Sequence, residues 1–159
     1  MAGKPSYEEL EAITARQLNR ENTLEKLFNL SLDMLCVANT DGYFQLVNKA
    51  FETTLGYSTQ TLLDTPYIEF VHQDDIAATL KAAQQLLVGE PLTCFENRYR
   101  CKDGSYKWLE WTCAPGTEEG LLYAVARDIT AQNELQQELA SQRDLLNNIL
   151  NNVPASIFW

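Results

Sequence analysis

The side chains that could perform chemistry in this chain are few and far apart. There is one histidine, His72, and none of the four cysteines forms a C-x-x-C pair. A structural zinc site needs several such ligands at close spacing, so no metal site is predicted. We expect the cysteines to be free thiols that fill apolar positions in strands. They are Cys36, Cys94, Cys101 and Cys113.

The acidic residues do not form a recognisable acid–base pair either. Glu69, Asp74, Asp75 and Glu96 carry carboxylates, but nothing in the sequence pairs two of them as general acid and base. Helix caps and a solvated surface account for them. The chain also lacks a G-x-S-x-G nucleophile motif and a glycine-rich phosphate loop. We therefore expect no enzyme active site in this segment, although a longer parent chain could carry one elsewhere.

Composition limits the partners. The 159 residues are 45% hydrophobic and 21% charged, which is typical of one globular domain with flanking helices. The net charge is −10, and a surface this acidic argues against binding nucleic acid or an anionic membrane. No apolar run approaches the roughly 18 residues that span a bilayer, so no direct membrane insertion is expected. With no signal peptide at the start, a cytoplasmic location is predicted.

The predicted elements that must position these side chains come in blocks. Two strands precede a group of helices, and three strands follow it, which indicates an α+β fold with an antiparallel sheet. Asp41-Gly42 and Asp103-Gly104 mark hairpin turns, and Gly56 ends a short helix. The predicted strands span residues 34–38, 43–47, 93–101, 106–114 and 121–127. The predicted helices span residues 7–28, 49–55, 58–63 and 129–152, with one more between residues 74 and 89.

Helix ends and faces follow from spacing. Ser58 and Thr130 are candidate N-caps, and Asp74 is expected to cap the helix before Gly89, with Asp75 complementing its dipole. The apolar stripe of that helix is predicted to contain Ile76, Leu80, Ala83 and Leu87.

Both terminal helices carry an apolar stripe at alternating three- and four-residue spacing, with polar interruptions. Such stripes pair with a second helix or lie on the domain's own sheet. We expect a homodimer through these flanking, coiled-coil-like helices. The stripe residues are Leu10, Ile13, Leu24 and Leu27 in the first helix and Leu135, Leu139, Leu146 and Ile149 in the last.

Four segments, taken in order, resemble a PAS domain, the sensory module of bacterial signalling proteins such as sensor histidine kinases. They are "DMLCVANTDGYFQLVNKAFETTLGYS", "FVHQDD", "FENRYRCKDGSYKWLEW" and "AVARDIT". The resemblance implies a five-stranded antiparallel sheet with helices on one face. It divides the chain into an N-terminal helix (1–28), a PAS domain (29–130) and a C-terminal signalling helix (131–152). "ILNNVPASIFW" can be laid over "LFNLSLDMLCV", so residues 153–159 are predicted to begin a second PAS domain.

The same resemblance bears on cofactors. His72 precedes the long helix, whereas a haem sensor carries its axial histidine within it, so haem is not expected. The stretch "LLDTPYIEF" lacks the cysteine of light-oxygen-voltage photosensors, and Ala126 stands where their glutamine is usual. Covalent flavin is therefore not expected, while a non-covalent flavin or another small ligand stays open.

Strand alternation assigns the aromatic side chains to faces. Leu109, Trp111 and Cys113 should face the helices, while Trp108 points outward with Val125 and Tyr106, and meets a helix of this chain or of a partner subunit. Either the inward aromatics only fill the core, or they line a pocket with Asn97 as its polar anchor. The pocket candidates are Phe51, Tyr67, Asn97, Tyr99, Trp111 and Ala126.

The predicted function is a sensory module that relays a ligand or redox cue. The match assigns Asp128, Ile129 and Thr130 to an exit motif whose aspartate bonds back to the domain, and an aspartate there can also cap the outgoing helix. A downstream output domain, such as a histidine kinase, would receive the signal. The alternative is a ligand-free module for dimerisation and relay.

Overall fold

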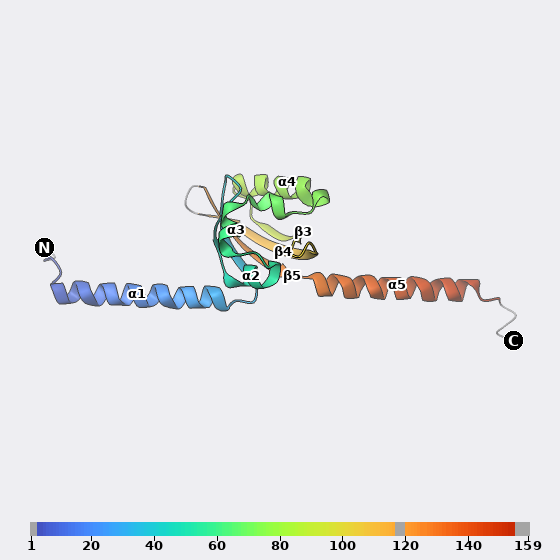
Figure 1. Ribbon diagram of the computed structural model, residues 1–159, viewed down its shortest axis with the longest axis horizontal. Coiled ribbons are helices and arrows are strands. Elements are labelled where there is room, and N and C mark those ends of the chain that lie inside the picture. The colour runs from blue at the N-terminus through green and yellow to red at the C-terminus, as the bar shows by residue number, and fades with distance from the viewer. Residues whose placement is uncertain (1–2, 117–119, 155–159) are drawn as a thin grey trace.

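A computed structural model describes residues 3–116 and 120–154, which contain a five-stranded antiparallel sheet in the order β2-β1-β5-β4-β3 (Figure 1). This confirms the predicted α+β fold, and each strand lies within two residues of its predicted position. The strands are β1 (Met34–Asn39), β2 (Phe44–Val47), β3 (Leu92–Arg100), β4 (Tyr106–Pro115) and β5 (Leu121–Asp128).

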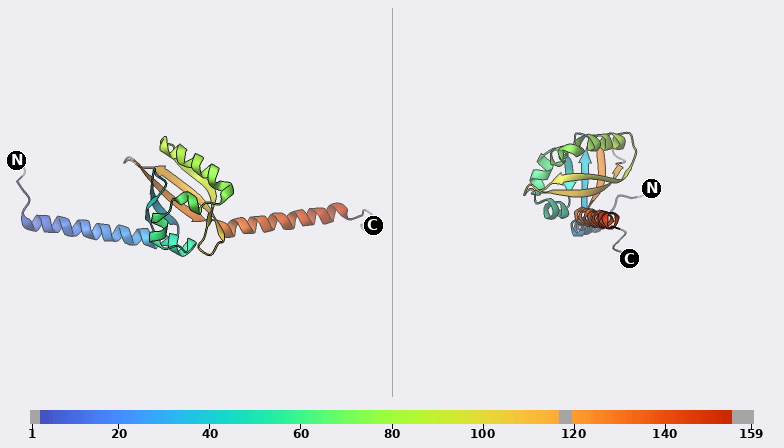
Figure 2. Two further views of the ribbon diagram at one scale, coloured as in Figure 1. Left: turned by 45° about the horizontal axis from the view of Figure 1, so that its top comes forward. Right: turned by 90° about the vertical axis from the view of Figure 1, so that its right-hand side faces the viewer.

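The inner helices gather over one face of this sheet (Figure 2). Local signals set their ends. Gly56 takes a φ of 86° after α2 and donates its N–H to the carbonyl of Glu52, and the Ser58 hydroxyl accepts the N–H of Thr61 at the start of α3. The helices are α2 (Lys49–Leu55), α3 (Thr59–Asp64) and α4 (Ile76–Leu87), with the 3₁₀ turns η1 (Tyr67–Phe70) and η2 (Gln73–Asp75) before α4.

The buried face of α4 differs from the predicted stripe. The side chains of Leu80 and Leu87 are 48% and 55% exposed. Thr79, Ala82 and Leu86 face the sheet instead. The predicted stripe was therefore only partly right: Ile76 packs against the core and Ala83 lies on the cavity wall, but Thr79, with its buried hydrogen-bond partner, and Leu86 take the places expected for Leu80 and Leu87.

The terminal helices α1 (Tyr7–Leu30) and α5 (Thr130–Asn152) extend from the domain in opposite directions (Figure 1). Neither has a buried residue among those described, so their stripes do not lie on the domain's own sheet. Leu24 and Leu139, at corresponding places in the two stripes, are each 58% exposed. The possibility of packing on the sheet is therefore wrong, and pairing with a second chain stays a prediction.

A buried asparagine ties α1 to the domain. Asn48 is fully buried, and its side-chain amide donates to the carbonyls of Phe28 and Asp33, at 2.9 and 3.0 Å. Its Oδ1 accepts the N–H of Leu35 at 3.0 Å. Asn48 thus connects the last turn of α1 to the start of β1, and α1 ends at Leu30, two residues beyond the end predicted for it.

At the other end, α5 stops at Asn152 and residues 155–159 lie outside the part that the structure describes. The predicted start of a second PAS domain falls almost wholly on them. Among the described residues, no helix combines the length and the hydropathy needed to cross a bilayer.

Candidate functional site

A cavity lies between the sheet and α4. Its volume, counted as the space open to the centre of a water-sized sphere, is about 70 Å³. One water needs roughly 10–15 Å³ by such a measure, so the cavity has room for a small molecule. Small side chains leave this space, with Ala82 and Ala83 on the helix side and Ala124 on the sheet side.

The structure brings most of the predicted pocket residues together. Tyr67, Asn97, Tyr99 and Trp111 all lie on the cavity wall. Phe51 and Ala126 do not: both are fully buried in the hydrophobic core beside it. Those two expectations are wrong, because alternation tells which face a side chain takes but not where along that face the space lies.

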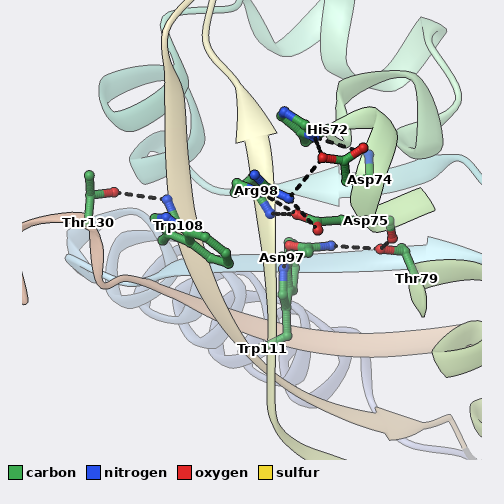
Figure 3. Close-up of polar contacts among 9 residues, drawn as sticks. All are labelled: His72, Asp74, Asp75, Thr79, Asn97, Arg98, Trp108, Trp111 and Thr130. Atoms are coloured by element: carbon green, nitrogen blue, oxygen red, sulfur yellow. Dashed lines mark hydrogen bonds and ion pairs between the residues drawn. The ribbon is translucent and has the colours of Figure 1, made fainter. Parts of the chain in front are cut away.

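Polar groups on the wall form a hydrogen-bonded chain (Figure 3). The Trp111 indole N–H donates to Asn97 Oδ1 at 2.7 Å, and Asn97 Nδ2 donates to the Thr79 hydroxyl at 3.1 Å. That hydroxyl donates in turn to the backbone carbonyl of Asp75 at 2.8 Å. The predicted polar anchor, Asn97, is therefore fixed between β4 and α4.

The chain continues from Asp75 to β3. Its carboxylate accepts the backbone N–H of Arg98 at 2.8 Å and two guanidinium N–H groups, each at 2.9 Å. These hydrogen bonds lower the pKa of Asp75 despite its partial burial, and they raise that of Arg98. The expectation that Asp74 caps α4 is wrong. Asp75 occupies the N-cap position, but its carboxylate binds Arg98 and not the first turn of the helix.

The Arg98 side chain connects Asp75 to the outer face of the sheet. Its guanidinium carbon lies 5.0 Å from the centre of the Trp108 ring, within the range of a cation–π contact. An arginine from the neighbouring strand thus covers part of Trp108, and the expected cover by a helix of this chain or of a partner subunit stays a prediction. Val125 and Tyr106 remain 39% and 43% exposed on this face.

His72 caps the 3₁₀ turn η2. Its Nδ1 accepts the N–H of Asp74 at 3.1 Å, at the start of η2. The ring packs edge-on against Tyr106, with centroids 4.7 Å apart. The proton of the neutral imidazole must then lie on Nε2.

The exit motif binds back to β4. The N–H of Trp108 donates to the Thr130 hydroxyl, and the N–H of Ile129 donates to the Trp108 carbonyl, both at 2.9 Å. Asp128 Oδ1 accepts the N–H and the hydroxyl of Thr130, at 3.0 and 2.6 Å. Thr130 is thus the first residue of α5 and not its N-cap; Ile129 holds that position without a side-chain bond.

The charge of Asp128 is balanced within the motif. Lys107 Nζ lies 3.4 Å from its Oδ2. Burial favours the neutral acid, but the hydrogen bonds from Thr130 and the nearby lysine outweigh it, so the pKa of Asp128 is lowered. A charged carboxylate just before the start of α5 also suits the helix dipole.

Several residues at the site escaped the sequence analysis. Thr79, Arg98 and Asn48 had no distinctive signal beyond their place in segments that resemble the family. The thiols of Cys36 and Cys113 lie on the cavity wall, where strand filler was expected. Alternation had already placed Cys113 on the inner face, and the same pattern in β1 could have placed Cys36 there.

Comparisons with known proteins agree with this geometry. A family model described as "PAS fold" matches residues 45–125. The PAS domain of an HTR-like protein from Haloarcula marismortui is 30% identical, with a TM-score of 0.67 over 75% of this chain and 99% of that one. The PAS-B domain of Drosophila melanogaster Cycle, solved with bound ethylene glycol, is 25% identical, with a TM-score of 0.52 over 60% of this chain and 96% of that one.

Among curated proteins, the Drosophila melanogaster protein Cycle is 32% identical over 93 residues. That match includes 55% of this chain but only 22% of Cycle, so the chain spans about a fifth of the length of this relative. The family model, by contrast, matches half of the chain, and the five-stranded sheet with its helical cover has the architecture of its members. The chain belongs to the PAS fold family.

Proposed function

We propose that this segment is a non-catalytic sensory module of a multidomain bacterial signalling protein, acting in the cytoplasm. A small molecule in the cavity would change the position of α5, which would pass the change to an output domain such as a histidine kinase. One observation carries the proposal: contacts run without a break from the cavity wall to the first residue of α5 (Figure 3).

The effect is expected to pass through Asn97. Its amide bonds both Trp111 and Thr79, so a ligand that presses on the cavity wall and lengthens one of these bonds shifts either the Trp111 side chain or α4. Movement of α4 would displace the Asp75 carboxylate and hence Arg98, which lies against Trp108. A ligand shifts such an equilibrium only by its difference in affinity for the two arrangements. Coupling along this route is measurable by NMR at the start of α5.

Membership of the PAS family supports a sensing role. The Cycle PAS-B structure holds ethylene glycol, which supports the view that a fold of this kind admits a small molecule. Because the chain spans only 22% of Cycle, the activity of that whole protein is not carried over.

The test uses the whole 159-residue chain. Native mass spectrometry of freshly purified protein, followed by thermal-shift screening of a metabolite library, identifies a ligand. Amide NMR signals of Ile129 and Thr130 then report on α5. We expect them to shift on binding, and to shift much less in Thr79→Val, which keeps the shape of the side chain but removes its hydroxyl. Full-strength shifts in that variant, or a bound ligand that leaves α5 unchanged, would refute the proposal.

A second candidate function is a ligand-free module for dimerisation and relay. The exposed stripes on α1 and α5 favour it, since leucines spaced three and four residues apart on one face of a helix can pack against a second helix. Light scattering should then give a dimer for the wild type and a monomer for Leu24→Glu or Leu139→Glu. Gln137→Glu, which adds the same charge away from the stripe, should stay dimeric. A monomeric wild type would remove this candidate.

A further inference from the structure

The cavity wall contains no charged side chain. Its residues, within the part of the chain that the structure describes, are alanine, leucine, phenylalanine, cysteine, tyrosine, threonine, asparagine and tryptophan. Burying an ion without an opposite charge is strongly unfavourable. A carboxylate, a phosphate or an ammonium group would therefore find no partner there. The wall is suited to uncharged molecules.

Two thiols lie on the wall on either side of a small residue. Cys36 in β1 and Cys113 in β4 are both register partners of Ala124 in β5. Strands in a sheet are about 4.8 Å apart, so the two cysteine backbones are separated by roughly 10 Å. That exceeds the reach of a disulfide, so the thiols stay separate, with the methyl group of Ala124 leaving space between them.

Two phenols complete the set of polar groups. Tyr99 packs between Phe70 and Trp111, with ring centroids 6.4 and 5.4 Å away. Tyr67 packs beside Phe44, at 5.8 Å. Among the described residues, no hydrogen bond joins either hydroxyl to another protein group, and neither oxygen is a fully buried atom left without a partner. Both tyrosines line the cavity, so each has a hydroxyl left for a bond to a molecule held there.

Burial keeps all four groups protonated. It raises the pKa of Cys113 to about 11, and that of Cys36 still further. It also raises the pKa of Tyr99 and of Tyr67, and the neighbouring thiols of Cys36 and Cys113 add to both increases. At neutral pH the wall therefore offers hydroxyl and thiol donors but no charge. The amide of Asn97, in contrast, already bonds Trp111 and Thr79.

From this geometry, and resting on the proposed sensory function, we infer the class of ligand. The cavity takes a small uncharged molecule that is apolar over most of its surface and carries one hydroxyl or carbonyl oxygen. The apolar part lies against the alanine and leucine side chains of α4, and the oxygen accepts a hydrogen bond from Tyr99 or Tyr67. Charged molecules of the same shape are rejected.

Matched pairs of probes test this inference. Benzyl alcohol and benzylammonium have nearly the same shape, as do benzamide and benzoate, and toluene lacks the oxygen. Each is titrated into the whole chain while the indole N–H signals are followed by NMR. Trp111 reports from the cavity wall, and Trp108 reports from the outer face, further along the route to α5. We expect each neutral probe to bind at least about 100-fold more tightly than its charged partner and to move the Trp111 signal first.

Variants separate the cavity from other sites. Ala124→Leu should fill the space and abolish the Trp111 response; Ala124→Val is the milder alternative if the leucine disturbs folding. Tyr99→Phe should weaken benzyl alcohol about fivefold to tenfold and leave toluene unchanged, because only the hydrogen bond is lost. Equal binding of benzoate and benzamide, binding that survives both Ala124 variants, or no binding by any probe would overturn the inference.

The outcomes also distinguish this inference from the sensory function. If a neutral probe binds in the cavity but leaves the amide signals of Ile129 and Thr130 unchanged, the ligand class stands and the sensory proposal fails. If benzoate or benzylammonium binds in the cavity and moves those signals, the sensory proposal stands and the ligand class fails.

Discussion

The buried bond between Asn97 and Trp111 gives the sharpest prediction about this fold. Asn97 is only 1% exposed, and its Oδ1 is the acceptor of the Trp111 indole N–H at 2.7 Å. Asn97→Leu keeps the size of the side chain but removes the acceptor and the donor to Thr79. The indole N–H is then left without a partner in a largely apolar place.

The cost can be worked from these contacts. Stranding a buried donor costs about 1–3 kcal/mol, and the lost bond to Thr79 contributes about 0.5–1.5 kcal/mol. Burying the leucine side chain offsets about 1–2 kcal/mol of this. We expect Asn97→Leu to lower the free energy of unfolding by about 2 kcal/mol, or the melting temperature by about 10 °C for a domain of this size.

A double-mutant cycle isolates the bond itself. Trp111→Phe removes the donor, so in Asn97→Leu/Trp111→Phe no stranded indole N–H remains. The double variant should therefore be about 1–2 kcal/mol more stable than the sum of the two single effects predicts. Urea unfolding followed by far-ultraviolet circular dichroism gives each value. Thr112→Val, an exposed position on the opposite face of β4, should change stability by less than about 0.5 kcal/mol. Single effects that add within about 0.3 kcal/mol would show that the bond is not a source of stability.

Three further predictions concern a turn, a charge and a thiol. Gly56→Ala should destabilise the fold by about 1 kcal/mol in urea unfolding, because the residue has a φ of 86°; no loss would contradict the assigned backbone. The pKa of Asp75 is lower in the folded state than in the unfolded state. Its carboxylate therefore contributes its full stabilisation above about pH 4, the pKa in the unfolded state, and this contribution is lost as the pH falls through the pKa of the folded state. Asp75→Asn should therefore lower the free energy of unfolding by about 1 kcal/mol at pH 7, a modest value because the carboxylate is 18% exposed. The variant should also lose less stability than the wild type between pH 5 and 3. The control Asp41→Asn should keep the wild-type dependence on pH. Iodoacetamide at pH 7.5 should label the exposed Cys94 well before the buried Cys36 by mass spectrometry, and equal rates would contradict their assigned burial.

Local signals in the sequence carried much of the fold. Asp41-Gly42, Asp103-Gly104 and Gly56 set turns and a helix end because few residues other than glycine adopt positive φ easily. Alternation placed Trp111 and Leu109 on the inner face, where they are 6% and 0% exposed. These features depend on neighbouring residues, so they can be read without knowing what lies across the sheet.

The sequence analysis did not find, by contrast, which distant side chains contact one another. The sequence suggested that Asp74 caps α4, yet Asp75 holds that position and its carboxylate binds the Arg98 side chain, which also contacts Trp108. Asp75 and Arg98 are separated by 23 positions, and nothing in their local pattern reveals the contact. It exists because η2 lies along the free edge of β3.

The sequence by itself determined the number of strands and their order along the chain, the faces of their side chains and the family that the chain resembles. Only the tertiary structure decided where the cavity lies, which residues line it and which contacts connect it to α5. The physical reason is that a strand or turn forms from the preferences of adjacent residues. A cavity, in contrast, is the space left where α4 and the sheet fail to fill the volume between them, and no single segment encodes that space.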